Sequence, residues 1–458
     1  MWLGQQPYQG GMCHILITLQ VTNKLLNSMK TTVLQTPTNS PHRIITNNIW
    51  VLSLVSLFTD TASEMLYPVM PVFLKHIGFS IIFIGVLEGV AEAVAGLSKS
   101  YFGKWSDVSG KRLPFVQFGY GLSAISKPMM AVFIFPLWIF FSRTIDRIGK
   151  GIRTGARDAM LSDASTEATR GRVFGFHRSM DTLGAVTGPC IALLYLYFNP
   201  QDYLTLFLIA FVPGLMAVGL TFLIKEKNSR QVDPNLSATP QSAASFSIKR
   251  INPLTTFAAY WKTSPTAYKK LTSGLLAFAL FNSSDVFLLL KMKESGLDDT
   301  AVIGVYIFYN LVYAMAAYPL GIVADKIGLK KILLAGLLLF SLVYTGFAFH
   351  QSIFIYCVLF ALYAMYAAAT ESISKAWISN LVDKTETATA IGTYSGFQSI
   401  AALIASTAAG LLWFNFGATV TFLITAGGAL GVVIYLLGMR VGVRHNKLFG
   451  DSTFIPGP

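Results

Sequence analysis

Charged residues are scarce in this chain: they make up 12% of its 458 residues, against about 25% in an ordinary soluble domain. This shortage excludes a soluble enzyme and a disordered chain. Cysteine is also scarce, with three residues far apart in the sequence. That number excludes a disulfide-stapled secreted domain, and neither the cysteines nor the six histidines show the spacing of a metal site. We therefore expect no metal and no cofactor.

Apolar sequence takes the place of the missing charge. Apolar and aromatic residues make up 53% of the chain, and the mean hydropathy is +0.56. Runs of about 20 such residues recur, and each can cross a hydrocarbon core about 30 Å thick as a helix. The sequence therefore predicts an all-α polytopic membrane protein with twelve transmembrane helices. The spans are expected near residues 49–73, 80–102, 113–135, 136–160, 172–199, 203–224, 270–290, 300–324, 329–349, 352–380, 388–414 and 417–439.

The Lys and Arg residues in the links predict the orientation, because short cytoplasmic loops hold the positive excess. With the N-terminus inside, the cytoplasmic segments carry 20 Lys and Arg residues and the outer segments carry 3. Both termini are therefore expected in the cytoplasm. The net charge of +13 does not indicate a nucleic-acid partner, because the basic residues are distributed over the cytoplasmic links. The basic segment 225–269 is expected to lie on an anionic inner leaflet, with a dedicated partner site as the alternative. The predicted parts are a leader, a six-helix half, a basic cytoplasmic loop, a second six-helix half and a tail, at residues 1–48, 49–224, 225–269, 270–440 and 441–458.

The predicted leader has two candidate starts. Met12–Val21 is apolar, but it is too short to span a membrane and no basic segment precedes it, so it is a poor signal peptide. Met29 and Lys30 begin a more ordinary cytoplasmic leader. Translation from Met1 and translation from Met29 both stay open.

One short pattern occurs twice, after span two and after span eight. Both copies read Gly, three residues, Asp, two residues, Gly and then basic residues, and they lie 218 residues apart. In a tight cytoplasmic turn the glycines permit positive φ and close helix approach, the acid can offset a helix N-terminus or a cation, and the basic residues keep the loop inside. The two sets are Gly103, Asp107, Gly110, Lys111, Arg112 and Gly321, Asp325, Gly328, Lys330, Lys331.

This repeat, at matching places in a chain of six plus six spans, resembles the signature loop of the major facilitator superfamily. The resemblance covers about residues 49–440. It implies two parallel, pseudo-symmetric six-helix bundles around a central site that opens alternately to each side. The two loops would then act as gating motifs.

Span five carries a second resemblance, to the superfamily's antiporter motif. The matching residues are Gly175, Gly184, Gly188 and Pro189. Ala192 and Leu193 stand where two further glycines are expected. The motif favours an exporter, whereas close helix packing and a proline bend explain the same residues without any functional role.

Span four is far more charged than the superfamily average, and here the chain resembles a prokaryotic branch with poorly defined substrates. At about 100° per residue, Asp146, Lys150, Arg153 and Arg157 fall within about 60° of one another. A charge at mid-bilayer costs about 2.5–3.5 kcal/mol even on a lenient scale. We therefore expect this stripe to face other charges or a wet cavity. The candidate substrate and cavity residues are Arg143, Asp146, Arg147, Lys150, Lys127, Arg178, Asp181 and Asp285.

Two pairs of acids are the candidates for proton coupling. Asp60 and Glu64 are four residues apart on span one, as are Glu88 and Glu92 on span two. Two carboxylates about 6 Å apart in a poorly solvated place cannot both ionise cheaply, so one of them can load and release a proton. The alternative for Glu88 and Glu92 is static pairing with a nearby cation.

The second half has few charges within its spans but many aromatic residues. Glu371 and Lys375 join Asp285 there. The aromatic residues that could line a cavity, or could simply pack, are Tyr306, Tyr309, Tyr313, Tyr363, Tyr366 and Phe397. We expect coupling chemistry in the first half and the bulk of the substrate against the second.

The sequence thus predicts a secondary active transporter with no enzymatic step. It would exchange protons for an exported small organic solute, anionic or zwitterionic, as a monomer in the bacterial inner (plasma) membrane. A proton-coupled importer of an anionic metabolite is the alternative, since the glycine motif of span five is incomplete. A non-transporting sensor or scaffold is a remote alternative, because the longest polar segment has only about 45 residues.

Overall fold

The computed structural model describes residues 44–67, 69–70, 73–74, 77, 81–226, 259–297, 299–349 and 352–439. Within these ranges the side chains of 81–93, 136, 299–300 and 303 are not described. Most of the predicted leader and central loop, and the whole predicted tail, therefore lie outside the described residues. So do the side chains of Glu88 and Glu92.

The first half of the described chain contains six long helices, where six spans are predicted. They are α2 (Asn47–Leu66), α4 (Ile81–Ser109), α5 (Leu113–Val132), α6 (Pro136–Asp163), α7 (Arg170–Phe198) and α8 (Tyr203–Thr221). Local sequence explains several of their starts. The Thr46 side chain accepts a hydrogen bond from the Ile49 amide, the Asp202 side chain accepts one from the Thr205 amide, and proline stands in the first turn of α5 and of α6.

The second half contains α10 (Thr266–Ala279), α11 (Val286–Glu294), α12 (Asp299–Ile327), α13 (Leu329–Phe349), α14 (Ile353–Leu381) and α15 (Thr387–Gly438). Gly417 interrupts α15 with a φ of 80°, which only glycine adopts readily, so α15 comprises two spans. Span seven was predicted to be continuous over 270–290, but residues 280–285 break it into α10 and α11. The break holds Asn, two Ser and Asp, whose short polar side chains compete with helical backbone hydrogen bonds.

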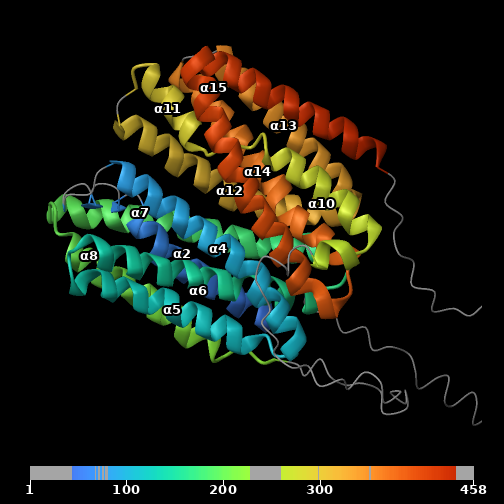
Figure 1. Ribbon diagram of the computed structural model, residues 1–458, viewed down its shortest axis with the longest axis horizontal. Coiled ribbons are helices and arrows are strands. Elements are labelled where there is room, and N and C mark those ends of the chain that lie inside the picture. Colours follow the sequence, from blue (N-terminus) through green and yellow to red (C-terminus); the bar gives the residue numbers. More distant parts are fainter. Residues whose placement is uncertain are drawn as a thin grey trace, which may run out of the picture. The chain divides into compact units, whose positions relative to one another are not determined.

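The two halves pack against each other chiefly through two pairs of helices. Figure 1 shows the first-half helices α2 and α4–α8 on one side and α10–α15 on the other, with α4 beside α15 and α7 beside α12. Seven described helices are apolar enough by composition alone to cross a membrane, and the charged α6 is not one of them. With α10 and α11 counted as one span and α15 as two, the described helices form the twelve spans of an all-α polytopic membrane protein, six in each of two bundles.

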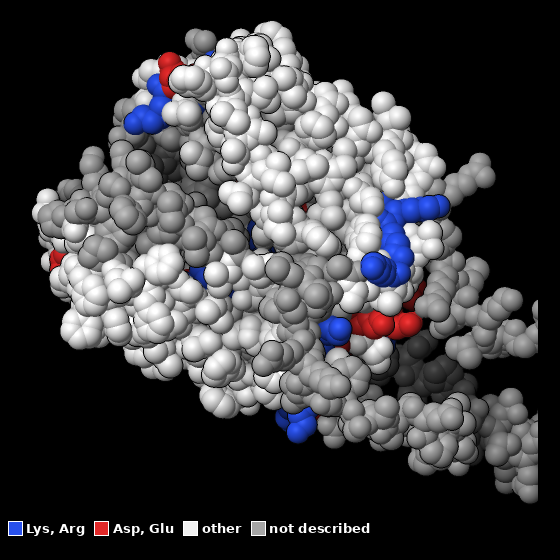
Figure 2. Space-filling view, in the orientation of Figure 1, with Lys and Arg blue, Asp and Glu red and all other residues white. Residues whose placement is uncertain are grey.

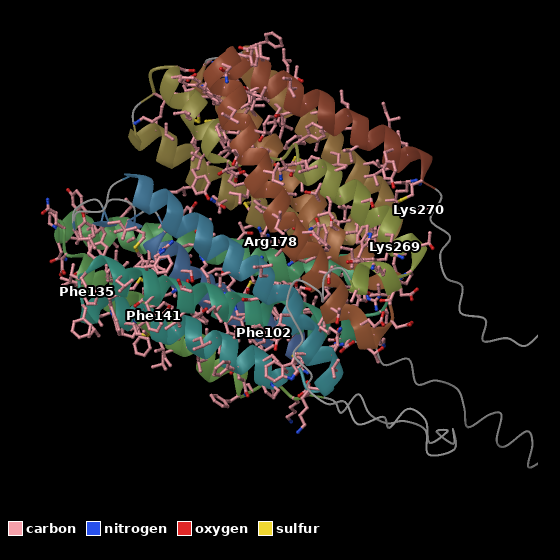
Figure 3. All side chains as sticks on the ribbon, viewed as in Figure 1. Phe102, Phe135, Phe141, Arg178, Lys269 and Lys270 are labelled. Carbon is pink, nitrogen blue, oxygen red and sulfur yellow. The ribbon has the colours of Figure 1, made fainter. Side chains whose placement is uncertain are left out.

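The outer surface suits a bilayer. Phe135 and Phe141 are about half exposed on the outside of the first half, where Figure 3 labels them. In Figure 2 the charged side chains form a few small groups with wide uncharged areas between them. Charge is instead concentrated inside, where the two halves meet.

Candidate functional site

A cavity of about 970 Å³ lies between the two halves, and both contribute to its wall. The first half supplies charged side chains from α2, α4, α6 and α7: Asp60, Glu64, Lys99, Lys150, Arg153, Arg157, Arg178 and Asp181. The second half supplies two acids, one base and four tyrosines: Asp285, Glu371, Lys375, Tyr306, Tyr309, Tyr313 and Tyr394. The wall is therefore mostly basic on one side, and acidic and aromatic on the other.

Asp60 of α2 and Asp181 of α7 are two carboxyl groups of the cavity wall that act on each other electrostatically. Asp181 has further partners, because Ser56 Oγ donates to it at 2.5 Å and Arg178 Nη1 donates at 2.7 Å. Arg157 Nη1 lies 4.0 Å from the same carboxylate. Two neighbouring carboxyl groups in a poorly solvated place cannot both ionise cheaply. Because these donors stabilise an ionised Asp181, Asp60 is the better candidate of the two to hold a proton.

Arg178 lines the cavity and joins the two halves, between which Figure 3 labels it. Besides Asp181 on its own helix, it pairs with Glu371 of α14, with 2.5 Å between Nη2 and Oε2. Its Nε donates to the Tyr313 hydroxyl at 2.6 Å, and the guanidinium lies 5.0 Å from the centre of that ring. One side chain thus connects an acid pair in the first half with an acid and a tyrosine in the second.

Asp158 forms a second bridge between the halves. It accepts hydrogen bonds from Arg157 Nε and Nη2 at 3.0 and 2.9 Å, and Lys375 Nζ of α14 lies 2.8 Å from its other oxygen. The Asp158 side chain is fully buried. Arg153, which belongs to the predicted stripe together with Arg157, donates to the Ser123 hydroxyl at 2.6 Å and lies 4.5 Å from the centre of the Tyr120 ring.

The remaining candidates of span four lie elsewhere in the first half. Lys127 and Asp146 form an ion pair of 2.9 Å. Together with Arg143 and Arg147 they line a separate, water-sized cavity of about 30 Å³, which Glu64 also borders. Glu64 therefore contacts both cavities. Of the predicted stripe on α6, Lys150, Arg153 and Arg157 reach the central cavity, whereas Asp146 lies at the smaller one.

The paired glycine–acid loops lie where the halves meet at one end of the cavity. Asp107 accepts hydrogen bonds from the Thr389 amide at 2.7 Å and hydroxyl at 2.8 Å, close to the start of α15. Asp325 accepts from the amides of Gly171 and Arg172 at 2.8 Å each, at the start of α7. Each acid therefore meets the N-terminus of a helix in the opposite half, where the positive end of the helix dipole favours it.

Basic residues add to the contacts at this end. Arg112 pairs with Asp107 at 3.1 Å and donates to the Lys384 carbonyl of the second half at 2.5 Å. Arg170 donates to the Ser379 carbonyl at 2.8 Å. Gly110 and Gly328 have φ values of 65° and 105°, as a tight turn requires. Lys330 donates to the Met439 carbonyl at 2.7 Å, within the second half.

The glycines of span five serve two different contacts. A Cβ added at Gly175 would lie 2.5 Å from the Ala317 carbonyl oxygen of α12, so this glycine lets the halves approach each other. A Cβ at Gly188 would lie 2.6 Å from the Met65 nitrogen of α2, so this one serves packing within the first half, as does Gly184. Pro189 lies inside α7. Packing therefore accounts for all three glycines.

The candidate site residues chosen from the sequence do not include Asp158, Glu371, Lys375 or Ser56. A signal for Glu371 and Lys375 was available, because the 218-residue offset of the repeat places them opposite Arg153 and Arg157 of the charged span four. Ser56 carries no signal in one sequence, since a serine within an apolar span is commonplace.

Comparison with known proteins adds independent findings. Residues 52–308 and 270–453 match the family model of the Major Facilitator Superfamily. An uncharacterized transporter of this type from Methanocaldococcus jannaschii is 31% identical over 405 residues, which cover 87% of this chain and 96% of that protein. An uncharacterized protein of Mycobacterium tuberculosis is 26% identical over 82% of this chain and 86% of its own length.

Two solved structures share the fold at low sequence identity. The human organic anion transporter MFSD10 has a TM-score of 0.67 at 16% identity, with 85% of this chain and 98% of that chain covered. The E. coli fucose:proton symporter has a TM-score of 0.65 at 12% identity, with 86% and 99% covered.

Proposed function

This chain belongs to the Major Facilitator Superfamily, and we propose that it is a secondary active transporter that exports a small organic solute in exchange for protons. The cavity of about 970 Å³ between the two halves carries this proposal. Its volume suits a small molecule, for which sites span about 300–1,000 Å³. Its wall also brings together acids and bases, which can bind both a proton and a charged solute.

The proposed cycle opens the cavity at one end at a time. The hydrogen bonds of Asp107 and Asp325 across the halves support closure at the end of the paired loops. The excess of Lys and Arg in the links assigns this end to the cytoplasm. The conformation described here would then be the one that receives protons from outside.

Proton coupling is assigned to Asp60 and its partner Asp181. Loss of the Asp60 proton would place two negative charges side by side at low dielectric, which is unfavourable. Arg178 is the cation best placed to neutralise both, because it already donates to Asp181 at 2.7 Å. If Arg178 moves toward the acid pair, its pairing with Glu371 of the other half weakens. Deprotonation would thus loosen a contact that holds the halves together.

Glu64 is a second candidate carrier, because it borders both the central and the water-sized cavity. Lys150 acts electrostatically on both Glu64 and Asp60 and lines the central cavity. A solute with an acidic group would find its counter-charge at Lys150. The solute is therefore proposed to be anionic or zwitterionic.

Export is proposed from the resemblance of span five to the antiporter motif alone, because the packing contacts described above account for its glycines whichever way the solute moves. The protein is further proposed to act as a monomer in a bacterial plasma membrane, with both termini in the cytoplasm. Fusing a reporter that fluoresces only in the cytoplasm to Pro458 tests that orientation. A fusion protein that is inserted into the membrane but does not fluoresce would contradict a cytoplasmic C-terminus.

Solute-dependent proton movement in proteoliposomes is the decisive test. A thermal-shift screen of the purified protein identifies the solute, because a bound ligand stabilises the folded state and raises the melting temperature. A pH-sensitive dye then reports protons that move with it. We expect Asp60→Asn to abolish the dye signal while solute binding persists. Solute flux that does not depend on the pH gradient would contradict proton coupling. Flux that is unchanged in Asp60→Asn and in Glu64→Gln would contradict a role for these two acids in it.

Asp202→Asn is the matched control for these variants. Asp202 caps α8 and accepts hydrogen bonds from the Tyr195 hydroxyl and the Thr205 amide, which lower the pKa of its carboxyl. It does not line the central cavity as described. Its replacement should leave proton movement unchanged. The direction of net solute accumulation separates an exporter from an importer.

A further inference from the structure

Asp285 is an acid of the cavity wall without a cationic partner. It lies at the break between α10 and α11, and among the described residues no Lys or Arg forms an ion pair with it. The Tyr363 hydroxyl donates to one of its oxygens at 2.6 Å. The charged group that acts on it electrostatically is Glu371, which is another acid. A carboxylate at this depth is costly unless a positive charge neutralises it.

Several tyrosines share the cavity wall with this acid. Tyr306 and Tyr309 line the same cavity, and Asp285 acts electrostatically on both. The ring centres of Tyr306 and Tyr309 are 5.9 Å apart, and those of Tyr309 and Tyr363 are 5.4 Å apart. A carboxylate together with aromatic rings in one cavity wall is the chemistry that binds a protonated amine or a quaternary ammonium group.

The opposite wall of the cavity has the complementary charge. Lys150 of α6 lines it, half-buried, together with Arg153, whose Nε is buried without a hydrogen-bond partner among the described residues. A solute that spans the cavity therefore meets positive charge on the first-half side and negative charge with aromatic rings on the second-half side.

We propose that Asp285, Tyr306 and Tyr309 bind a cationic amine of the solute, and that an acidic group of the same molecule faces Lys150. The assignment rests on the proposed transport function and narrows it, because it selects the zwitterion from the two solute classes named above. A proton alone could neutralise Asp285, but a proton gains nothing from the tyrosine rings. Proton binding also has its own pair of acids at Asp60 and Asp181.

Three probes with one common ring test the assignment by isothermal titration of the purified full-length protein. Phenethylamine carries only the amine, hydrocinnamate carries only the carboxylate, and 4-(2-aminoethyl)hydrocinnamate carries both, at opposite ends of the ring. We expect this bifunctional probe to bind most tightly. Asp285→Asn should weaken binding of phenethylamine and of the bifunctional probe about 10-fold or more and change binding of hydrocinnamate less than about twofold. Lys150→Gln should weaken binding of hydrocinnamate and of the bifunctional probe and leave phenethylamine unaffected.

Two further variants distinguish the loss of a contact with the amine from a change in the structure of the protein. Asp285→Glu keeps the charge and should restore most of the affinity for phenethylamine. Tyr306→Leu keeps the acid and should weaken both amine probes about fivefold. An unchanged melting temperature without ligand confirms that each variant is folded.

Several outcomes would overturn the assignment. Absence of binding by both amine probes would do so, as would hydrocinnamate binding more tightly than the bifunctional probe, or amine affinities that Asp285→Asn leaves unchanged. These measurements use no pH gradient. If the dye assay shows no proton movement but the affinities follow the expected order, proton coupling is therefore refuted and the amine site is still supported.

Discussion

Replacing Gly175 by alanine should open the contact between the halves without unfolding either of them. The added Cβ would lie 2.5 Å from the Ala317 carbonyl oxygen and 3.2 Å from the Gly321 Cα. Ordinary contacts between such atoms begin at about 3.5 Å. Both obstacles are backbone atoms, so no rotation of a side chain can make room. The helices α7 and α12 must separate by about 1 Å.

The magnitude follows from what that separation breaks. Inserting a methyl group into a packed contact costs about 1–3 kcal/mol. The same displacement would stretch the hydrogen bonds of 2.8 Å that join Asp325 to the amides of Gly171 and Arg172. A cost of about 1–3 kcal/mol lowers the ratio of closed to open molecules by about 5- to 150-fold. A conformation that is rare in the parent protein should then become common.

Electron–electron resonance between two spin labels measures this ratio. Lys111→Cys and Glu386→Cys place one label in each half on exposed residues at the closed end. The background replaces the native cysteines Cys13, Cys190 and Cys357 by serine. The parent should give one short distance, and Gly175→Ala should add a longer one.

Two alanine substitutions serve as controls. Gly188→Ala lies on the same helix and overlaps equally, with 2.6 Å to the Met65 nitrogen, but its obstacle belongs to the same half. It should lower the melting temperature and leave the distances unchanged. Gly304→Ala has open space around it and should change neither. An unaltered distance distribution in Gly175→Ala, or an equal shift in Gly188→Ala, would refute this account of the contact.

Three further predictions concern the ion pairs. Glu371→Gln removes one charged partner of Arg178 and should raise the open population up to about fivefold in the same labelled background, because a solvated pair is worth about 1 kcal/mol or less. Asp146→Asn leaves Lys127 buried without the carboxylate that lies 2.9 Å away and should lower the free energy of unfolding by about 3–5 kcal/mol, as measured in thermal melts. Adding Lys127→Met to this variant should restore most of the lost stability. Asp325→Asn replaces the charged acceptor of two amides and should favour opening by about 1.5–3 kcal/mol, read from the spin-label distances.

The fold could be predicted from the sequence because a bilayer demands long apolar helices. The exception was span seven, whose apolar average conceals the break between α10 and α11. That break is held by partners far away in the sequence: the Ser284 amide donates to the Ser406 hydroxyl at 3.1 Å, and Tyr363 donates to Asp285. No local window contains both sides of such a contact.

The residues of the candidate site could largely be predicted from the sequence, but the level along each helix at which a residue meets its partner could not. Helical periodicity places Asp146, Lys150 and Arg157 on one face of α6, and Lys150 and Arg157 line the central cavity. Asp146 lies about one turn from Lys150, where Lys127 of α5 meets it instead. Periodicity gives the direction of a side chain around its helix, whereas the depth at which a neighbouring helix supplies a partner depends on the packing.

The charged groups of the cavity are arranged so that separation of the halves would leave few of them unpaired. Glu371 and Lys375 are four residues apart on α14, so they can pair with each other once they lose Arg178 and Asp158 of the first half. Arg178 would keep Asp181 at 2.7 Å. Asp158, likewise, would keep Arg157. An unpaired buried charge costs about 3–5 kcal/mol, whereas an exchange of partners costs only the difference between two pairs. The proposed cycle thus requires acids and bases in neighbouring positions on each half, which is how this sequence distributes them.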